Sequence, residues 1–137
     1  MALDMELEMS GNSKDWAELD LILEEIGLSH VEVRDASGVR AVLGSGELTV
    51  GTAFGQPRRD GQIRAEGMHG CTFKVNANAE FRINNSMYDE AVATIKTVLT
   101  RLTERTDMLF VLSFQYEEVR AIRDRERGFE WFWNDSR

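Results

Sequence analysis

The chain has little of several residue types on which particular classes of protein depend. It contains one cysteine, Cys71, among 137 residues, so no disulfide can form within it. No apolar run approaches the roughly 20 residues that a membrane-spanning helix needs. Acidic residues also stand near the N-terminus, where a signal peptide would be basic and then apolar. We therefore expect a cytoplasmic protein that does not enter a membrane.

Basic residues are in deficit as well. Sixteen Lys and Arg face 24 Asp and Glu, which gives a net charge of −8. The first 30 residues hold eight of these acids and a single lysine. Direct binding of nucleic acid depends on clustered Lys and Arg, so we do not expect it. A basic protein partner fits the charge, because opposite fields speed association, but an acidic surface that serves only solubility fits it equally well.

Motifs that carry chemistry are also missing. There is no Walker-type glycine loop, no GxGxxG between a strand and a helix, and no GxSxG elbow. The only histidines are His30 and His69, and His69 could form a nucleophilic pair with Cys71 only if a third group oriented them. The alternate acids of residues 4–8 would lie roughly 6.6 Å apart on a strand, too far to wrap one cation. We expect no enzyme, no cofactor and no metal.

The middle of the chain predicts a strand, a helix and a second strand. Unbroken alternation over Cys71–Ile83 indicates one long strand with a buried face and a wet face. Apolar residues then recur at helical spacing over 86–105, with Ser86 as the cap and Asp89 closing a capping box. The continuous apolar run over 108–114 is typical of a central strand that is buried on both faces.

The first 50 residues predict a strand, a helix and several short strands. Residues 2–9 alternate between apolar and mostly acidic side chains, which favours a strand. A helix follows near 14–27, begun by Ser13 or Asp15 and ended by Gly27. Short strands are expected after it, in a register that the sequence leaves open: 30–34, 39–43 and 48–50.

Two further segments complete the chain. Residues 51–70 are rich in glycine and contain the single proline, so we expect a loop. Arg58 and Arg59 at its tip could grip an anion, but a solvated, mobile tip is the simpler interpretation. Near the C-terminus the aromatic residues at 129, 131 and 133 share one parity, which favours closure of the core over anchoring of an interface.

These elements together predict the fold class. We expect a single α+β domain over residues 1–137, because no repeat, low-complexity stretch or boundary divides the chain. In it an antiparallel-rich sheet carries two helices, near 14–27 and 86–105, packed on one face.

Two surfaces are candidates for binding a partner. The first helix places like charges four residues apart and acids at its C-terminal end, each at a cost of only tenths of a kcal/mol. Either this arrangement of charges is simply tolerated, or the surface is kept acidic for a partner. The residues of this first surface are Glu18, Asp20, Glu24 and Glu25. The second surface is the wet face of the long strand, which carries Asn residues that strands disfavour. Its residues are Lys74, Asn76, Asn78, Glu80 and Arg82.

The order of these features matches a known pattern. Met1-Ala2-Leu3 opens an alternating strand, a later strand ends in Phe81-Arg82-Ile83-Asn84, and an amphipathic helix leads to the apolar run 109–114 and to a terminal Gly128-Phe129-Glu130-Trp131-Phe132-Trp133. In this the chain resembles the Sit-type immunity proteins, the third family of those named after swarming inhibition. The resemblance is strongest over 71–133 and 1–9. It implies a small cytoplasmic antidote, without catalytic residues, that binds a polymorphic, contact-dependent toxin encoded beside it.

The expected function is therefore neutralisation of a cognate protein toxin by tight stoichiometric binding that occludes its active site. If the toxin is a nuclease, the acids of the first helix would stand in for phosphates in a basic groove. The alternative is a non-catalytic regulatory or scaffolding adaptor, including a homodimer formed through an exposed sheet edge. A small enzyme with a site in the loop around 55–70 is a more distant alternative.

Overall fold

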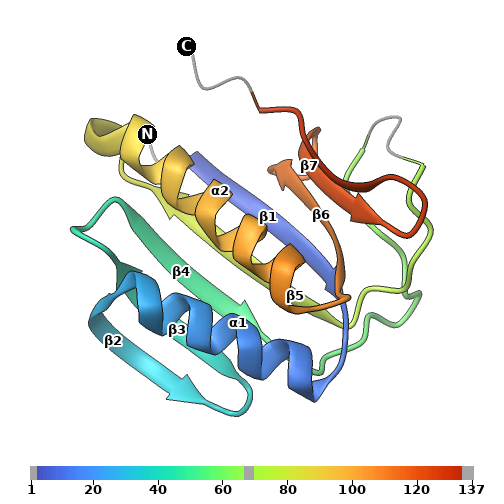
Figure 1. Cartoon of the computed structure of the whole chain (residues 1–137), viewed down its shortest axis with the longest axis horizontal. Helices are drawn as coiled ribbons and strands as arrows, with labels where there is room; N and C mark the ends of the chain where they lie inside the picture. The colour runs from blue at the N-terminus through green and yellow to red at the C-terminus, as the bar shows by residue number, and fades with distance from the viewer. Residues whose placement is uncertain (1–2, 67–69, 134–137) are drawn as a thin grey trace.

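An antiparallel sheet of eight strands forms the frame of the molecule, and two helices lie on one of its faces (Figure 1). The computed structural model describes residues 3–66 and 70–133, and the fold of this part is α+β. The strands are β1 (Leu3–Ser10), β2 (Leu28–Asp35), β3 (Gly38–Leu43), β4 (Leu48–Ala53), β5 (Ala77–Ile83), β6 (Leu109–Phe114), β7 (Glu118–Asp124) and β8 (Gly128–Trp131). Their order across the sheet is β2-β3-β4-β5-β1-β6-β7-β8.

The first strand lies in the interior of the sheet. β1 pairs antiparallel with β5 on one side and with β6 on the other. Its odd-numbered side chains Met5, Leu7 and Met9 are at most 1% exposed, and they lie on the face that carries the helices. The predicted strand near residues 2–9 is confirmed over the described residues.

Helix α1 (Ser13–Ile26) buries the stripe that its spacing predicts, with Leu19, Ile22 and Leu23 in the core. Its cap differs from the prediction. Asn12 accepts hydrogen bonds from the backbone of the first turn, and the Asp15 side chain accepts the Asn12 N–H at 2.9 Å. Asp15 thus closes a capping box from inside the helix, and neither Ser13 nor Asp15 is the cap.

Helix α2 (Tyr88–Arg105) begins later than the start near residue 86 that the sequence predicts. A short 3₁₀ turn, η1 (Asn85–Met87), precedes it, and the Asn84 side chain caps this turn by accepting the N–H of Ser86 at 3.2 Å. The expected capping box of Ser86 and Asp89 is therefore wrong, because Asn84 already occupies the position from which a side chain reaches that first turn. The end of the helix at Arg105 is as predicted.

The predicted long strand over Cys71–Ile83 is wrong in its first half. β5 begins only at Ala77, although burial still alternates from Cys71 onward. The Val75 N–H donates to the carbonyl of Gly61 at 3.1 Å, so the backbone here bonds to the preceding loop and leaves the sheet ladder. Cys71 consequently packs on the face of the sheet opposite the helices, in a small second cluster of buried residues.

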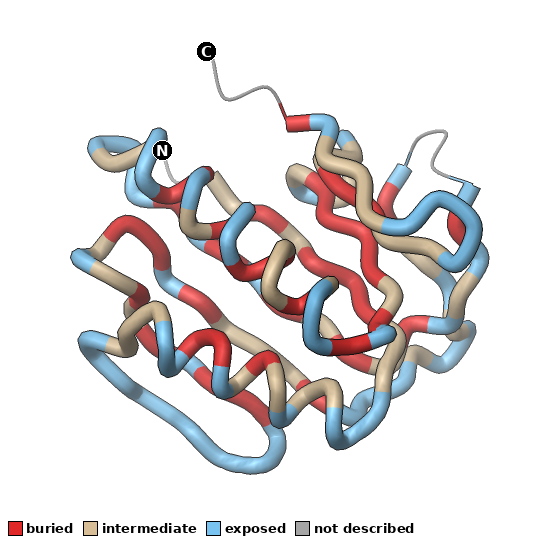
Figure 2. The backbone as a smooth tube through the Cα atoms, in the orientation of Figure 1, coloured by how far each residue is buried: buried red, intermediate tan, exposed pale blue. Residues whose placement is uncertain are grey.

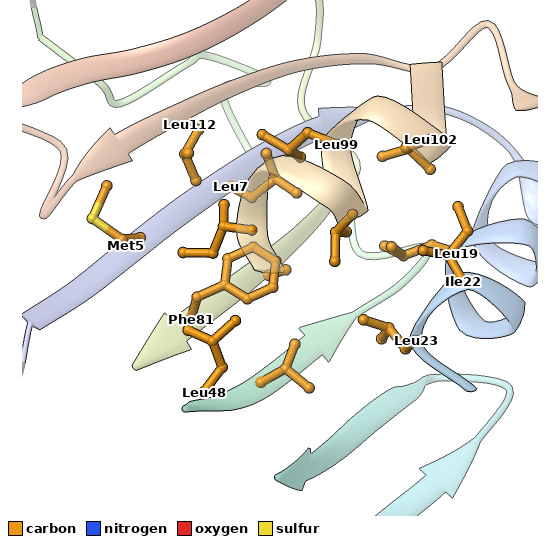
Figure 3. Close-up of a cluster of buried hydrophobic side chains, with 14 of the residues drawn as sticks. Met5, Leu7, Leu19, Ile22, Leu23, Leu48, Phe81, Leu99, Leu102 and Leu112 are labelled. Carbon is orange, nitrogen blue, oxygen red and sulfur yellow. The ribbon is translucent and has the colours of Figure 1, made fainter. Parts of the chain in front are cut away.

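The main core lies between the sheet and the two helices, and Figure 3 shows its side chains pointing toward one another from both layers. Phe81 of β5 is fully buried there, next to Leu7 of β1 and Leu48 of β4. The continuous apolar run is buried on both faces, as predicted, because Val111 joins the second cluster while Phe110 and Leu112 join the main core. Trp133 is 5% exposed and donates to the Tyr88 hydroxyl at 3.1 Å, so the terminal aromatics do close the core.

The outer edge strands carry features that oppose pairing with another chain. β2 is exposed along almost its whole length (Figure 2), with Val31 and Val33 at 46% and 44%. Its register with β3 shifts twice, at Ser29 and at Glu32, and such bulges twist an edge away from a flat strand partner. The opposite edge strand, β8, has only four residues. Dimerisation through a sheet edge stays a prediction that this geometry does not favour.

Candidate partner-binding face

The face of the sheet opposite the helices is covered at one end only. Residues 58–66 and 70–73, which we call the covering segment, pack on this face beneath β6 and β7, where Ala65 and Cys71 contact Val111 and Ile122. Across β3, β4, β5 and the first half of β1 the same face carries mostly polar side chains, and no element among the described residues covers it. We call this uncovered area the open sheet face.

Glu8 of β1 fixes the covering segment to the sheet. Its side chain is 0% exposed and forms an ion pair with Arg58, whose side chain is 8% exposed. The Glu8 carboxylate also accepts the backbone N–H groups of Arg64 and Ala65, at 2.7 and 2.8 Å. The expectation of a solvated, mobile tip is therefore wrong at Arg58. This residue does bind an anion, and the anion is the Glu8 carboxylate of the same chain.

Strand register places one row of residues across the open sheet face. Arg40 of β3 stands opposite Gly51 of β4, which stands opposite Glu80 of β5. Glu80 in turn stands opposite Glu6 of β1, and Glu6 opposite Ser113 of β6. The row thus carries a cation, a position without a side chain, two adjacent carboxylates and a hydroxyl.

A shallow hollow of about 290 Å³ lies over Gly51. Its walls are formed by side chains from three strands, among them Arg40, Asn78, Glu80 and Arg82. A Cβ atom added to Gly51 would meet nothing within 4 Å, so the space above the backbone is open. A glycine inside a strand commonly marks a place where another molecule approaches the backbone closely.

The two carboxylates of the row are not independent. Burial raises the pKa of Glu6 to about 7, and the neighbouring Glu80 adds to the shift by repulsion and by a hydrogen bond that the protonated form makes. The negative charge of Asp4 acts in the same direction, while a hydrogen bond from Tyr116 opposes it. Near pH 7 the Glu6 carboxyl is therefore protonated for about half of the time.

This pair predicts a pH dependence of stability. Because the folded-state pKa of Glu6 lies above its ordinary value of 4.5, the stability that protonated Glu6 contributes to the fold is fully present below pH 4.5. It is lost as pH rises through about 7. We expect Glu6→Gln to gain about 1 kcal/mol relative to wild type between pH 5 and pH 8, a figure reduced for solvent screening of this half-buried side chain. Urea unfolding at several pH values measures it, and parallel curves for the two proteins would contradict the assignment.

The first predicted surface, on α1, is largely neutralised within the chain. Arg34 of β2 contacts Asp20 at 3.1 Å and also pairs with Glu24. Glu25 binds Arg105 at 2.6 Å, and that hydrogen bond lowers the pKa of the Glu25 carboxyl. The fourth acid, Glu18, is half-buried, and its charge acts on Arg105 as well. The unfavourable placement of acids on α1 is thus explained by ion pairs within the same chain.

The second predicted surface is divided by the structure. Asn78, Glu80 and Arg82 lie together on the open sheet face, and Arg82 pairs with Asp4 at 3.1 Å. Asn76 lies before β5 and holds the backbone of Gly11 through two hydrogen bonds, of 3.1 and 2.8 Å. Lys74 also precedes β5, beside Gly61 of the covering segment. Only three of the five residues therefore share the face.

Sequence reasoning missed several residues of this face, namely Arg40, Gly51, Glu6, Ser113 and Tyr116. The four strand residues lie on the expected parity and Tyr116 lies in the turn after β6, but the pairing of β1 with β5 joins residues that are 68 to 80 positions apart. Alternation alone cannot supply that partner. The surplus of acids on one face of the first strand was the available signal. It predicts a raised pKa for Glu6 only once Glu80 is known to lie opposite it.

The cysteine shows no sign of nucleophilic activation. Burial, with the nearby charge of Asp124, raises the pKa of the Cys71 thiol, and its sulfur lies 3.7 Å from an Arg127 nitrogen. His69, the predicted partner, lies outside the described residues. Within the described ranges no group of three or more His, Cys, Asp or Glu is arranged to hold a metal ion. No described helix is long and apolar enough to cross a membrane.

With the face described, the chain can be compared with known proteins. No family model, curated protein or solved structure matches it. The open sheet face is thus interpreted from its own chemistry.

Proposed function

We propose that this protein is an immunity protein, which binds a cognate polymorphic, contact-dependent toxin and blocks its active site. The observation that carries the proposal is the open sheet face: a rigid, polar, uncovered surface with a hollow at Gly51 and acidic groups on the neighbouring strands. The net charge of −8 adds long-range attraction for a basic partner.

The geometry favours the open sheet face over α1 as the binding surface. On α1 the carboxylates of Asp20, Glu24 and Glu25 already have arginine partners, which a basic toxin groove would have to displace. On the open sheet face Glu6 and Glu80 form no ion pair with any described residue, although Arg82, which pairs with Asp4, acts on Glu80 by its charge. Uncompensated carboxylates gain more from an incoming cation than carboxylates that are already paired.

The experiment for this proposal is co-expression with the product of the neighbouring gene in a susceptible host. We expect growth to be restored only when this protein is present, and the two chains to co-purify in fixed stoichiometry. If the neighbouring product kills equally well while this protein is present and folded, the immunity proposal fails for that pair. A harmless neighbour would favour the regulatory or scaffolding adaptor.

Single charge changes distinguish the two surfaces. We expect Glu80→Lys to weaken toxin binding about tenfold or more, because it places a cation where the partner presents one. Glu24→Gln on α1 should change the affinity less than about twofold, since exposed ion pairs contribute little. Surface plasmon resonance with an inactivated toxin measures both variants. The reverse order of effects would return the interface to Glu18, Asp20, Glu24 and Glu25.

A further inference from the structure

The pair Glu6 and Glu80 has a feature that solubility alone does not explain. Like charges directly opposite on adjacent strands destabilise a sheet. Here both carboxylates stand opposite one another on the open sheet face, and no described basic residue forms an ion pair with either. Arg82, the nearest described cation on the same strand, pairs with Asp4 at 3.1 Å.

A second observation lies in the same row. The Ser113 hydroxyl is on the strand position opposite Glu6, its residue is 0% exposed, and its oxygen has no hydrogen-bond partner. A buried hydroxyl without a partner destabilises the folded state. The Glu6 carboxylate is the polar group directly across from it.

The third observation is the hollow beside the pair. Gly51 stands opposite Glu80 on the other side of β5, and the open space above Gly51 leads to the Glu80 side chain. A long side chain that enters over Gly51 can lay its aliphatic stem on the strand and bring its charged end to the carboxylates. Lysine and arginine have this shape, with an apolar stem and a charged tip.

We propose that the hollow over Gly51 and the facing carboxylates of Glu6 and Glu80 form a receptor for one basic side chain of a protein partner, and that binding releases a proton. The inference specifies the binding site of the proposed function. Before binding, the Glu6 carboxyl holds a proton at pH values below about 7. When an arginine or lysine side chain enters, the proton passes to solvent, and two carboxylates face one cation.

Other charged groups around Glu6 set the background against which this exchange occurs. From the elements packed around it and around the hollow they are Asp4 and Glu8 of β1, Glu80 and Arg82 of β5, Tyr116 after β6, Arg58 and Arg64 of the covering segment, and Arg40 of β3, which lines the far side of the hollow. Arg58 is engaged by the buried Glu8, and Arg82 by Asp4. Neither can therefore replace the incoming cation without abandoning a carboxylate of its own.

The test uses the free protein and a small probe, so it does not depend on knowing the toxin. N-acetyl-arginine amide is titrated into the isotope-labelled chain at pH 8 and pH 5.5, followed by amide and side-chain carboxyl NMR signals. The matched control is N-acetyl-citrulline amide, which has the same shape without the charge. We expect the arginine probe to shift the NMR signals of Gly51, Glu80 and Glu6 at pH 8. At pH 5.5 these shifts should be at least fivefold smaller. The arginine probe should also lower the pH midpoint at which Glu6 titrates.

A double variant, Glu6→Gln with Glu80→Gln, should lose this response while keeping a folded spectrum, since Glu80 is exposed and Glu6 is half-buried. Equal responses to the arginine and citrulline probes, or a response that survives the double variant, would overturn the receptor. That outcome would leave toxin neutralisation through other residues untouched. Conversely, a harmless neighbouring gene product would end the toxin proposal without altering the NMR result.

Discussion

Replacing Glu8 with alanine is expected to lower the free energy of unfolding by about 3–5 kcal/mol, because it leaves a buried cation without its partner. The Glu8 side chain is 0% exposed and that of Arg58 only 8%. The substitution also removes the acceptor of the Arg64 and Ala65 backbone N–H groups, and each lost hydrogen bond adds to the cost. Urea unfolding followed by tryptophan fluorescence measures the loss.

The matched control for Glu8→Ala lies on the same strand and the same face. Asp4 pairs with Arg82, whose side chain is 58% exposed, so Asp4→Ala should cost less than about 1 kcal/mol. A double variant, Glu8→Leu with Arg58→Met, should recover part of the loss, because it removes both buried charges together. If Glu8→Ala costs no more than Asp4→Ala, the covering segment is not held to the sheet by this carboxylate.

Substitution of Gly51 by tyrosine is expected to weaken toxin binding about 100-fold or more while leaving the fold intact. The new ring would fill the hollow at the centre of the proposed interface, where single residues often account for 2 kcal/mol or more of binding energy. A Cβ atom at this position meets nothing within 4 Å, and tyrosine is favoured in strands. Thermal stability should therefore stay level or rise while affinity, measured by calorimetry with an inactivated toxin, falls.

A tyrosine on the other side of the molecule provides the control for Gly51→Tyr. Ala93 is exposed on α2, which lies on the opposite face of the sheet (Figures 1 and 2). Ala93→Tyr adds a ring of the same kind and should leave affinity unchanged. Wild-type affinity in a folded Gly51→Tyr variant would show that the toxin does not use the hollow.

Most of the fold could be predicted from local patterns, since each pattern reports which side of an element is buried. Alternation identified β1, and helical spacing identified α1 and α2 with their buried stripes. The same reasoning failed over residues 71–76 because burial alternates there too, against a different core on the other face of the sheet. Alternation reveals a buried side but not which core covers it.

The candidate site was predictable only in part, because it is made by pairing between distant strands. The sequence indicated that Asn78, Glu80 and Arg82 share a wet face, and they do. It could not show that Glu6 lies opposite Glu80, or that Gly51 leaves a gap beside them. The arginine partners of the α1 acids were hidden for the same reason, since they come from β2 and α2.

The measurement that tests the central claim most directly is a growth assay with three versions of this protein, each co-expressed with the product of the neighbouring gene. Wild type, Gly51→Tyr and Ala93→Tyr are expressed to equal folded levels in the same susceptible host. The account predicts that wild type and Ala93→Tyr protect the cells and that Gly51→Tyr does not. Full protection by Gly51→Tyr would contradict binding through the open sheet face, and failure of all three versions would contradict immunity itself.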